Sequence, residues 1–97
     1  MQPESRFVET NGVNHHYLEW GAADKPSVLM FHAVGMCAGI WNHAARDLAL
    51  DHHVYSFDLR GHGDTEHPDG EYTFMQIGHD TASVIQALGL EGSICIG

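Results

Sequence analysis

Three short runs of apolar and β-prone residues constrain this sequence more than any other feature. They span residues 27–31, 53–57 and 93–97, and each is too short for an ordinary helix. The last run is almost wholly apolar, which is typical of a central parallel strand buried on both faces. Helical patterns separate the runs, and strands that alternate with helices favour a parallel sheet with right-handed crossovers. The sequence therefore predicts an α/β fold.

The two segments between these runs carry helical signals. In the first, Ile40, Ala44 and Leu48 recur at helical spacing, which predicts a buried face made of these residues with Trp41 and Ala45 beside it. The second begins with Thr73 and Gln76, whose spacing is that of a capping box. Its predicted buried stripe consists of Ile77, Thr81, Val84, Ile85 and Leu88.

A β-hairpin precedes the first parallel strand. Residues 7–20 read as two β-prone arms around Asn11-Gly12, a pair that supplies the positive φ angles of a type I′ turn. Alternation in the second arm predicts that three of its residues share one face: His16, Leu18 and Trp20. The predicted order is hairpin, strand, helix, strand, helix, strand, within one domain over residues 1–97.

Composition excludes several kinds of partner. Lys and Arg number 4 against 13 Asp and Glu, a net charge of −9 that opposes binding to nucleic-acid phosphates. No apolar run approaches the length of a membrane span, and the polar first six residues show no signal peptide, so we expect a cytoplasmic protein. Cys37 and Cys95 lie in apolar surroundings, which predicts reduced thiols in the core.

Two loops carry the residues that are suited to catalysis or ligand binding. His32-Ala33-Val34-Gly35 follows the first parallel strand, and residues 58–65, with the sequence DLRGHGDT, follow the second. In this order, before a capped helix and an apolar strand ending in glycine, they resemble the N-terminal part of the α/β-hydrolase fold superfamily. The resemblance runs from Phe7 to Gly97. Its strongest piece is residues 58–65, similar to the D-x-R-G-x-G-x-S loop of esterase-like and lactonase-like members, with threonine in place of the serine.

The resemblance assigns expected roles to several residues. Val34 matches the position whose backbone N–H helps to hold an oxyanion, and Ala33 replaces the glycine usual before it. Met36 and Cys37 are expected to line the substrate pocket. Five residues are expected to brace the loops: His32, Asp58, Arg60, Gly61 and Gly63. Gly97 matches the first glycine of the G-x-S-x-G nucleophile elbow, which places the nucleophile, the acid and the catalytic histidine beyond it.

The implied activity is hydrolysis of an ester, lactone or related acyl bond of a small molecule, without a cofactor. The remainder of the hydrolase domain, in the same or a second chain, would then be a partner. The 97 residues alone would be inactive and incomplete at the C-terminus. Two alternatives stay open: a non-enzymatic, receptor-like ligand-binding protein on the same fold, and a cut or split product held against a second chain.

Metal and nucleotide sites are the rival interpretations. The nine histidines include the adjacent pairs His15-His16 and His52-His53, but neighbours in a strand point to opposite faces, so neither pair can chelate an ion. We therefore expect no metal site. The segment from Gly61 lacks the third glycine of G-x-G-x-x-G, and no P-loop lysine occurs, which argues against nucleotide binding.

Overall fold

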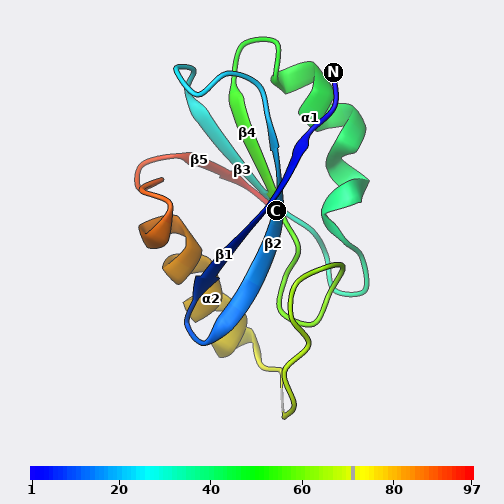
Figure 1. Ribbon diagram of the computed structural model, residues 1–97, viewed down its shortest axis with the longest axis vertical. Coiled ribbons are helices and arrows are strands. Elements are labelled where there is room, and N and C mark those ends of the chain that lie inside the picture. The colour runs from blue at the N-terminus through cyan, green and yellow to red at the C-terminus, as the bar shows by residue number, and fades with distance from the viewer. Residues whose placement is uncertain (71) are drawn as a thin grey trace.

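The structure, a computed structural model, describes residues 1–70 and 72–97. Five strands form one sheet (Figure 1): β1 (Glu4–Thr10), β2 (Val13–Trp20), β3 (Ser27–Phe31), β4 (His53–Phe57) and β5 (Ile94–Ile96). Their order is β1-β2-β4-β3-β5; β4, β3 and β5 are parallel, and β2 is antiparallel to β1 and β4. The helices are η1 (Ala38–Trp41), α1 (Asn42–Leu48) and α2 (Phe74–Ala87). The predicted α/β fold is confirmed.

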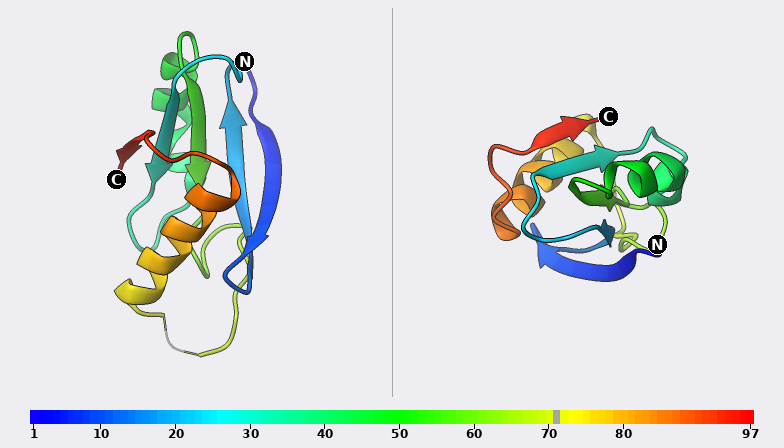
Figure 2. Two further views of the ribbon diagram at one scale, coloured as in Figure 1. Left: turned by 90° about the vertical axis from the view of Figure 1, so that its left-hand side faces the viewer. Right: turned by 90° about the horizontal axis from the view of Figure 1, so that it is seen from above.

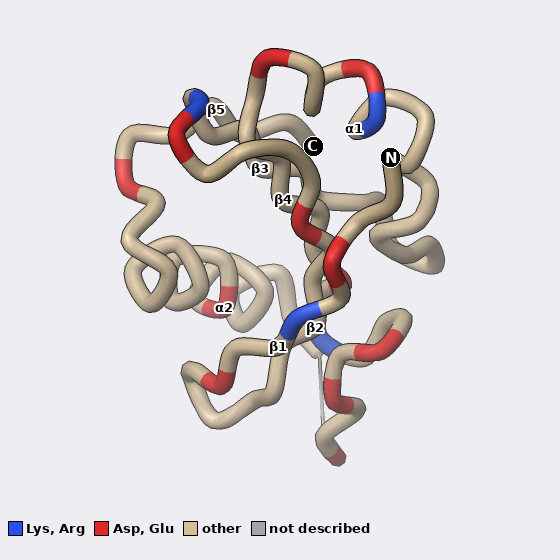
Figure 3. Tube along the Cα trace, turned by 45° about the horizontal axis from the view of Figure 1, so that its top comes forward, with Lys and Arg blue, Asp and Glu red and all other residues tan. Residues whose placement is uncertain are grey.

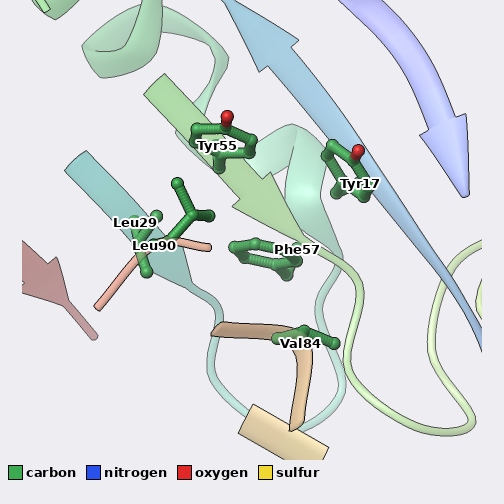
Figure 4. Close-up of a cluster of buried hydrophobic side chains, with 6 residues drawn as sticks. All are labelled: Tyr17, Leu29, Tyr55, Phe57, Val84 and Leu90. Atoms are coloured by element: carbon green, nitrogen blue, oxygen red, sulfur yellow. The ribbon is translucent and has the colours of Figure 1, made fainter. Parts of the chain in front are cut away.

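The helices cover opposite faces of the sheet, as Figure 2 shows. On the α2 face, Val84 and Leu90 pack against strand residues that are mainly aromatic (Figure 4): Tyr17, Leu29, Tyr55 and Phe57. On the α1 face, Ala45 and Ala49 pack against the other side of the strands, at Trp20, Val28, Met30 and Val54. Two cores, one on each face, therefore hold the sheet between its helices.

The local signals that rest on near neighbours are confirmed. Asn11 and Gly12 have φ angles of 53° and 74°, as a type I′ turn requires. At the start of α2, the Gln76 N–H donates to Thr73 Oγ1, and the Thr73 N–H donates to Gln76 Oε1, each over 3.1 Å. This is the predicted capping box.

The predicted face of the first helix is confirmed for Trp41, Ala45 and Leu48 and wrong for Ile40 and Ala44. The chain first forms the 3₁₀ turn η1, and α1 begins only at Asn42, so Ile40 is not in phase with the α-helix. Ile40 is 49% exposed and Ala44 is exposed, whereas Ala45 is fully buried. Trp41 and Leu48 are partly buried against the same core as Ala45.

The apolar run at residues 93–97 forms a strand, β5, but this strand is not buried on both faces among the described residues. Within the described residues, β5 pairs with β3 alone and lies at the edge of the sheet. Ile94 is 58% exposed. Cys95 on β5 and Cys37 before η1 are both free and exposed, so they are not core thiols.

Acidic residues occur along the whole trace, while basic residues occupy only a few positions (Figure 3). Among the described residues, no helix combines the length and the apolar character needed to cross a bilayer.

Candidate functional site

The carboxyl ends of β3 and β4 lie side by side in the parallel sheet, with Phe31 opposite Phe57. The two loops predicted to carry chemistry leave the sheet together at this edge (Figure 1). In open α/β sheets, ligands bind outside the carboxyl ends of the strands. The geometry of these loops therefore defines the candidate site.

A tight turn presents the Val34 N–H at this edge. The Met36 N–H donates to the Ala33 carbonyl over 3.1 Å, and Gly35 has a φ of +89°, so residues 33–36 form a type II turn. Val34 occupies the second position, whose N–H takes no part in such a turn. Among the described residues, no hydrogen bond involves this N–H, and the Val34 side chain is 66% exposed. Ala33 needs no positive φ here, so alanine fits where the resemblance expects glycine.

Two histidines connect the turn to the loop after β4. His32 donates from Nδ1 to the Ala33 carbonyl and accepts the Leu59 N–H at Nε2, over 2.8 and 3.0 Å. His62 donates from Nδ1 to the Arg60 carbonyl and accepts the Gly35 N–H at Nε2, each over 2.9 Å. A ring that donates at one nitrogen and accepts at the other is neutral. The ring centroids lie 5.0 Å apart, so the pair forms a compact bridge between the loops.

Asp58, at the end of β4, is a buried carboxylate with three donors. It accepts from the Ala38 N–H at 2.7 Å, the Asp64 N–H at 3.0 Å and His16 Nδ1 at 2.7 Å. Burial alone would raise the pKa of Asp58, but these donors together hold that pKa below its usual value. Asp58 is therefore an anion that ties η1, the following loop and β2 together.

Arg60 bonds to α2 and not to the turn through the glycines. Its guanidinium makes a bidentate contact with Asp80, with Nε–Oδ2 and Nη2–Oδ1 distances of 2.8 and 2.9 Å. Asn11 of the hairpin turn donates to the same carboxylate over 2.8 Å. Burial opposes ionisation, yet Arg60 and Asn11 hold the pKa of Asp80 below its usual value. This cluster joins the hairpin, the loop and α2.

Gly61 and Gly63 have φ angles of +73° and +51°. A Cβ on Gly61 would lie 2.1 Å from the Tyr72 ring, and a Cβ on Gly63 would lie 2.3 Å from the Asp58 carboxyl group. Both positions therefore require glycine for conformation and for space.

The sequence was compared with known proteins. Residues 26–97 match the family model described as the alpha/beta hydrolase fold. The chain belongs to this family.

Among curated relatives of this alpha/beta hydrolase chain, epoxide hydrolase A of Mycobacterium tuberculosis is 30% identical over 98% of the chain. The 2-hydroxy-6-oxo-6-(2'-aminophenyl)hexa-2,4-dienoic acid hydrolase of Metapseudomonas resinovorans is 33% identical over 94% of it. Among solved structures, an epoxide hydrolase from Vigna radiata superposes with a TM-score of 0.88 at 34% identity, over 98% of this chain and 31% of that one. The chain spans 30% and 32% of the two curated relatives, about a third of their length.

A pocket lies beside the turn of this alpha/beta hydrolase chain. It has a volume of about 390 Å³ and is lined by mainly apolar residues at the start of α2 and in the two loops: Val34, His62, Tyr72, Thr73, Phe74 and Ile77. Met36 is 50% exposed and Cys37 is exposed, and neither lines this pocket. That they line a substrate pocket stays a prediction.

Sequence reasoning missed four residues that hold the site together: His16, His62, Thr65 in its bonding role, and Asp80. His62 had a visible signal, because it lies between the two glycines of the recognised motif. His16 also had one, since it shares the inward face of its strand with Leu18 and Trp20, and a buried histidine needs a partner. Asp80 had none, because nothing near it in sequence indicates that it meets Arg60.

One cluster has the composition of a metal site. Ligand atoms of His16, Asp58 and Asp64 lie within 4.8 Å of one another. His16 and the Asp64 N–H already bond to Asp58, so the cluster is explained by its own hydrogen bonds. A cation would have to displace these bonds.

Proposed function

We propose that this chain is the N-terminal part of a hydrolase domain that acts on an ester, lactone or related acyl bond of a small molecule. The observation that carries the proposal is the Val34 N–H, which has no partner among the described residues and projects from a turn at the carboxyl edge of the sheet. A preorganised N–H at such a place can stabilise the oxyanion that forms when a carbonyl is attacked.

In this proposal the nucleophile, the catalytic histidine and the acid lie beyond residue 97, in the remainder of the domain, on the same or a second chain. A serine or similar nucleophile attacks the carbonyl, the histidine moves its proton, and two N–H groups hold the oxyanion. Val34 supplies one of the two. No step requires a cofactor. His32, Asp58, Gly61 and Gly63 brace the two loops, Arg60 joins the second loop to α2, and none of the five touches a reacting atom.

The pocket beside Val34 supports an apolar substrate group. Tyr72, Phe74 and Ile77 line it, and Phe74 is 85% exposed, so this apolar surface is open to a ligand. His62 is the only titratable ring besides Tyr72 in the lining, and both of its nitrogens are engaged by backbone groups. An acyl group without charge is therefore the best fit.

Opening of an epoxide is the second candidate, because two of the relatives reported above are named epoxide hydrolases at 30% and 34% identity. Ring opening also develops negative charge on an oxygen, which an N–H donor stabilises. Assays of the full-length protein with 4-nitrophenyl butyrate and with styrene oxide separate the two activities.

The decisive variant is Val34→Pro in the full-length protein. Proline is favoured at the second position of a type II turn and removes only the N–H, so the turn should survive. We expect kcat to fall about 10²–10³-fold, the usual effect of losing one oxyanion donor. Val34→Ala shortens the same side chain but keeps the N–H. The ratio of kcat between the two variants therefore measures the contribution of this N–H donor to catalysis. Equal activities for the two variants would refute the role of this N–H.

A receptor-like binding protein on the same fold is the alternative without catalysis. The residue two positions after Gly97 in the full-length sequence separates the two, because the elbow pattern places the nucleophile there. A serine or another nucleophilic side chain supports the hydrolase. A small inert residue at that position would support the binding protein.

A further inference from the structure

A second constellation with the parts of a nucleophilic site joins the β1–β2 hairpin to Asp58. The Ser5 hydroxyl on β1 lies 2.6 Å from His16 Nε2, and His16 Nδ1 lies 2.7 Å from Asp58 Oδ2. The order is hydroxyl, imidazole, carboxylate, each within hydrogen-bond distance of the next. We propose that Ser5 is an acyl-accepting nucleophile, activated by His16, that reacts with neutral esters.

The direction of each hydrogen bond follows from the charge on Asp58. Its three donors keep this carboxyl group ionised, so it only accepts. His16 must therefore donate from Nδ1, and in the neutral ring, the form that a general base requires, Nε2 then carries a lone pair. The remaining proton in the chain is that of the Ser5 hydroxyl, which donates to Nε2. This is the arrangement in which a histidine can act as a general base toward a hydroxyl group.

The base is held rigidly. The His16 N–H donates to Thr65 Oγ1 over 2.8 Å, and its carbonyl accepts the Asp58 N–H over 3.0 Å. Thr65 Oγ1 in turn donates to the Asp58 carbonyl over 2.6 Å. Backbone and side chain of His16 are thus both bonded to the Asp58 loop, so the ring cannot turn away from Ser5. Asp58 acts through His16 and is a positioning residue.

Access and charge indicate the class of substrate. His16 and Asp58 are each 4% exposed, whereas Ser5 is exposed, so the nucleophile faces solvent and the base does not. Phe7 lies on the same face of β1 as Ser5. Phe7 is 53% exposed and its ring lies 5.0 Å from the His16 ring, so Phe7 offers an apolar surface beside the Ser5 hydroxyl. Asp64, 77% exposed and 4.0 Å from His16 Nδ1, disfavours anions. Neutral esters with an apolar or aryl group fit these surroundings.

The step balances without a co-reactant. The Ser5 Oγ attacks the ester carbonyl while its proton moves to His16 Nε2. The ester C–O bond then breaks, the new Oγ–acyl bond remains, and the leaving alcohol takes the proton from Nε2. The products are acylated Ser5 and one alcohol.

This inference does not rest on the proposed function, whose nucleophile lies beyond residue 97. The test uses the full-length protein, and because adducts are located peptide by peptide, labelling of Ser5 is measured separately from labelling of any nucleophile beyond residue 97. Either result leaves the test at Val34 unaffected. Ser93 serves as a comparison inside the same molecule, because its hydroxyl donates to the Leu90 carbonyl over 2.6 Å and not to a histidine.

The experiment treats the full-length protein with 4-nitrophenyl acetate, and separately with an alkyl fluorophosphonate, and locates the adducts by peptide mass spectrometry. Among the serines of residues 1–97 we expect one adduct, at Ser5, formed at least about 100-fold faster than at Ser93, the lower end of what general-base assistance contributes. Adducts on the exposed thiols of Cys37 and Cys95 are counted separately. Ser5→Ala should abolish the serine adduct, while Ser93→Ala should leave it unchanged. In concentrated urea the preference for Ser5 should disappear.

Two further variants test the base and its orientation. His16→Gln should reduce the ratio of Ser5 to Ser93 labelling at least about tenfold, with a native circular dichroism spectrum. Asp58→Asn, which we expect to be much less stable, should reduce this ratio to the same extent under conditions in which circular dichroism shows that it remains folded. If either variant unfolds, the comparison of Ser5 with Ser93 in the unmodified protein still decides the question. Similar labelling rates at Ser5 and Ser93 before urea is added would overturn the proposal. So would rapid labelling of the β1–β2 hairpin peptide that persists in Ser5→Ala.

Discussion

Replacing Asp58 by asparagine should destabilise the fold strongly, although the two side chains have nearly the same shape. The carboxylate is 4% exposed and accepts three hydrogen bonds, from Ala38, Asp64 and His16. An amide has one oxygen and one NH₂ group. At least one of the three donors would therefore face another donor in the variant.

The magnitude follows from these contacts. A hydrogen bond to a charged group contributes about 1.5–3 kcal/mol, and a buried donor left without an acceptor costs about 1–3 kcal/mol. One lost bond, one unpaired donor and two weakened bonds together predict that the free energy of unfolding falls by about 3–5 kcal/mol. Native domains have only about 5–15 kcal/mol in total. The variant should be close to unfolding.

Urea denaturation of Asp58→Asn and the unmodified chain measures this difference, with Asp24→Asn as the control. Asp24 is exposed, so its replacement should change the free energy of unfolding by no more than about 0.5 kcal/mol. A loss below about 1 kcal/mol for Asp58→Asn would refute the argument that the three donors stabilise the fold.

Acid supplies a second test of the same reasoning. The pKa of Asp58 is lower in the folded chain than the unperturbed 3.8. Between the two pKa values the unfolded state binds more protons, so the stability that Asp58 contributes is present above pH 3.8 and is lost as the pH falls through the folded pKa. The difference in the free energy of unfolding between Asp58→Asn and the unmodified chain should therefore become smaller below about pH 4. The pKa of Asp80 is also lowered, but this carboxyl group is present in both proteins.

Two further predictions concern glycine and the sheet edge. Gly63→Ala should lower the free energy of unfolding, measured by urea denaturation, by at least about 2 kcal/mol, because the new Cβ would lie 2.3 Å from the Asp58 carboxyl group. Gly12→Ala should lower it by only about 1 kcal/mol, because Gly12 has open space around it and only the positive φ disfavours alanine. Equal losses would contradict the steric argument. Ile94→Lys on the exposed edge of β5 should reduce concentration-dependent association in sedimentation, while Leu50→Lys should not. Association that is unaffected by Ile94→Lys would show that the edge is not responsible.

The elements that could be predicted from sequence are those set by near neighbours. The Asn11-Gly12 turn and the Thr73 cap depend on residues at most three positions apart, and both are present. The face of the first helix depended on where the α-helix begins, and the 3₁₀ turn η1 shifted that point past Ile40. The burial of β5 depended on what lies beside it in space, which a run of apolar residues does not reveal.

In the candidate site, too, features set by near neighbours could be predicted from the sequence and features set by distant contacts could not. The motif located Asp58 and the glycines, but their partners are distant in sequence. His16 lies 42 positions from Asp58, and Gly35 lies 27 positions from His62. The sequence pattern identifies a residue that needs a hydrogen-bond partner, but only the register of the sheet determines which residue becomes that partner. Thus β2, which pairs with β4 antiparallel, brings His16 to Asp58.

The pairing of buried carboxylates reflects the composition of the chain. Against 13 acidic residues there are only 4 Lys and Arg, but 9 histidines. Arg60 pairs with Asp80, whereas the partner of Asp58 is His16. Glu19 contacts both His53, over 2.6 Å, and Arg6. Arginine has no acceptor atom, whereas a neutral imidazole that donates to a carboxylate keeps a free lone pair on its second nitrogen. At His53 no second bond is present among the described residues, but at His16 that lone pair meets the Ser5 hydroxyl. Histidine in place of a permanent cation is therefore what allows a pair that stabilises the fold to serve as a base as well.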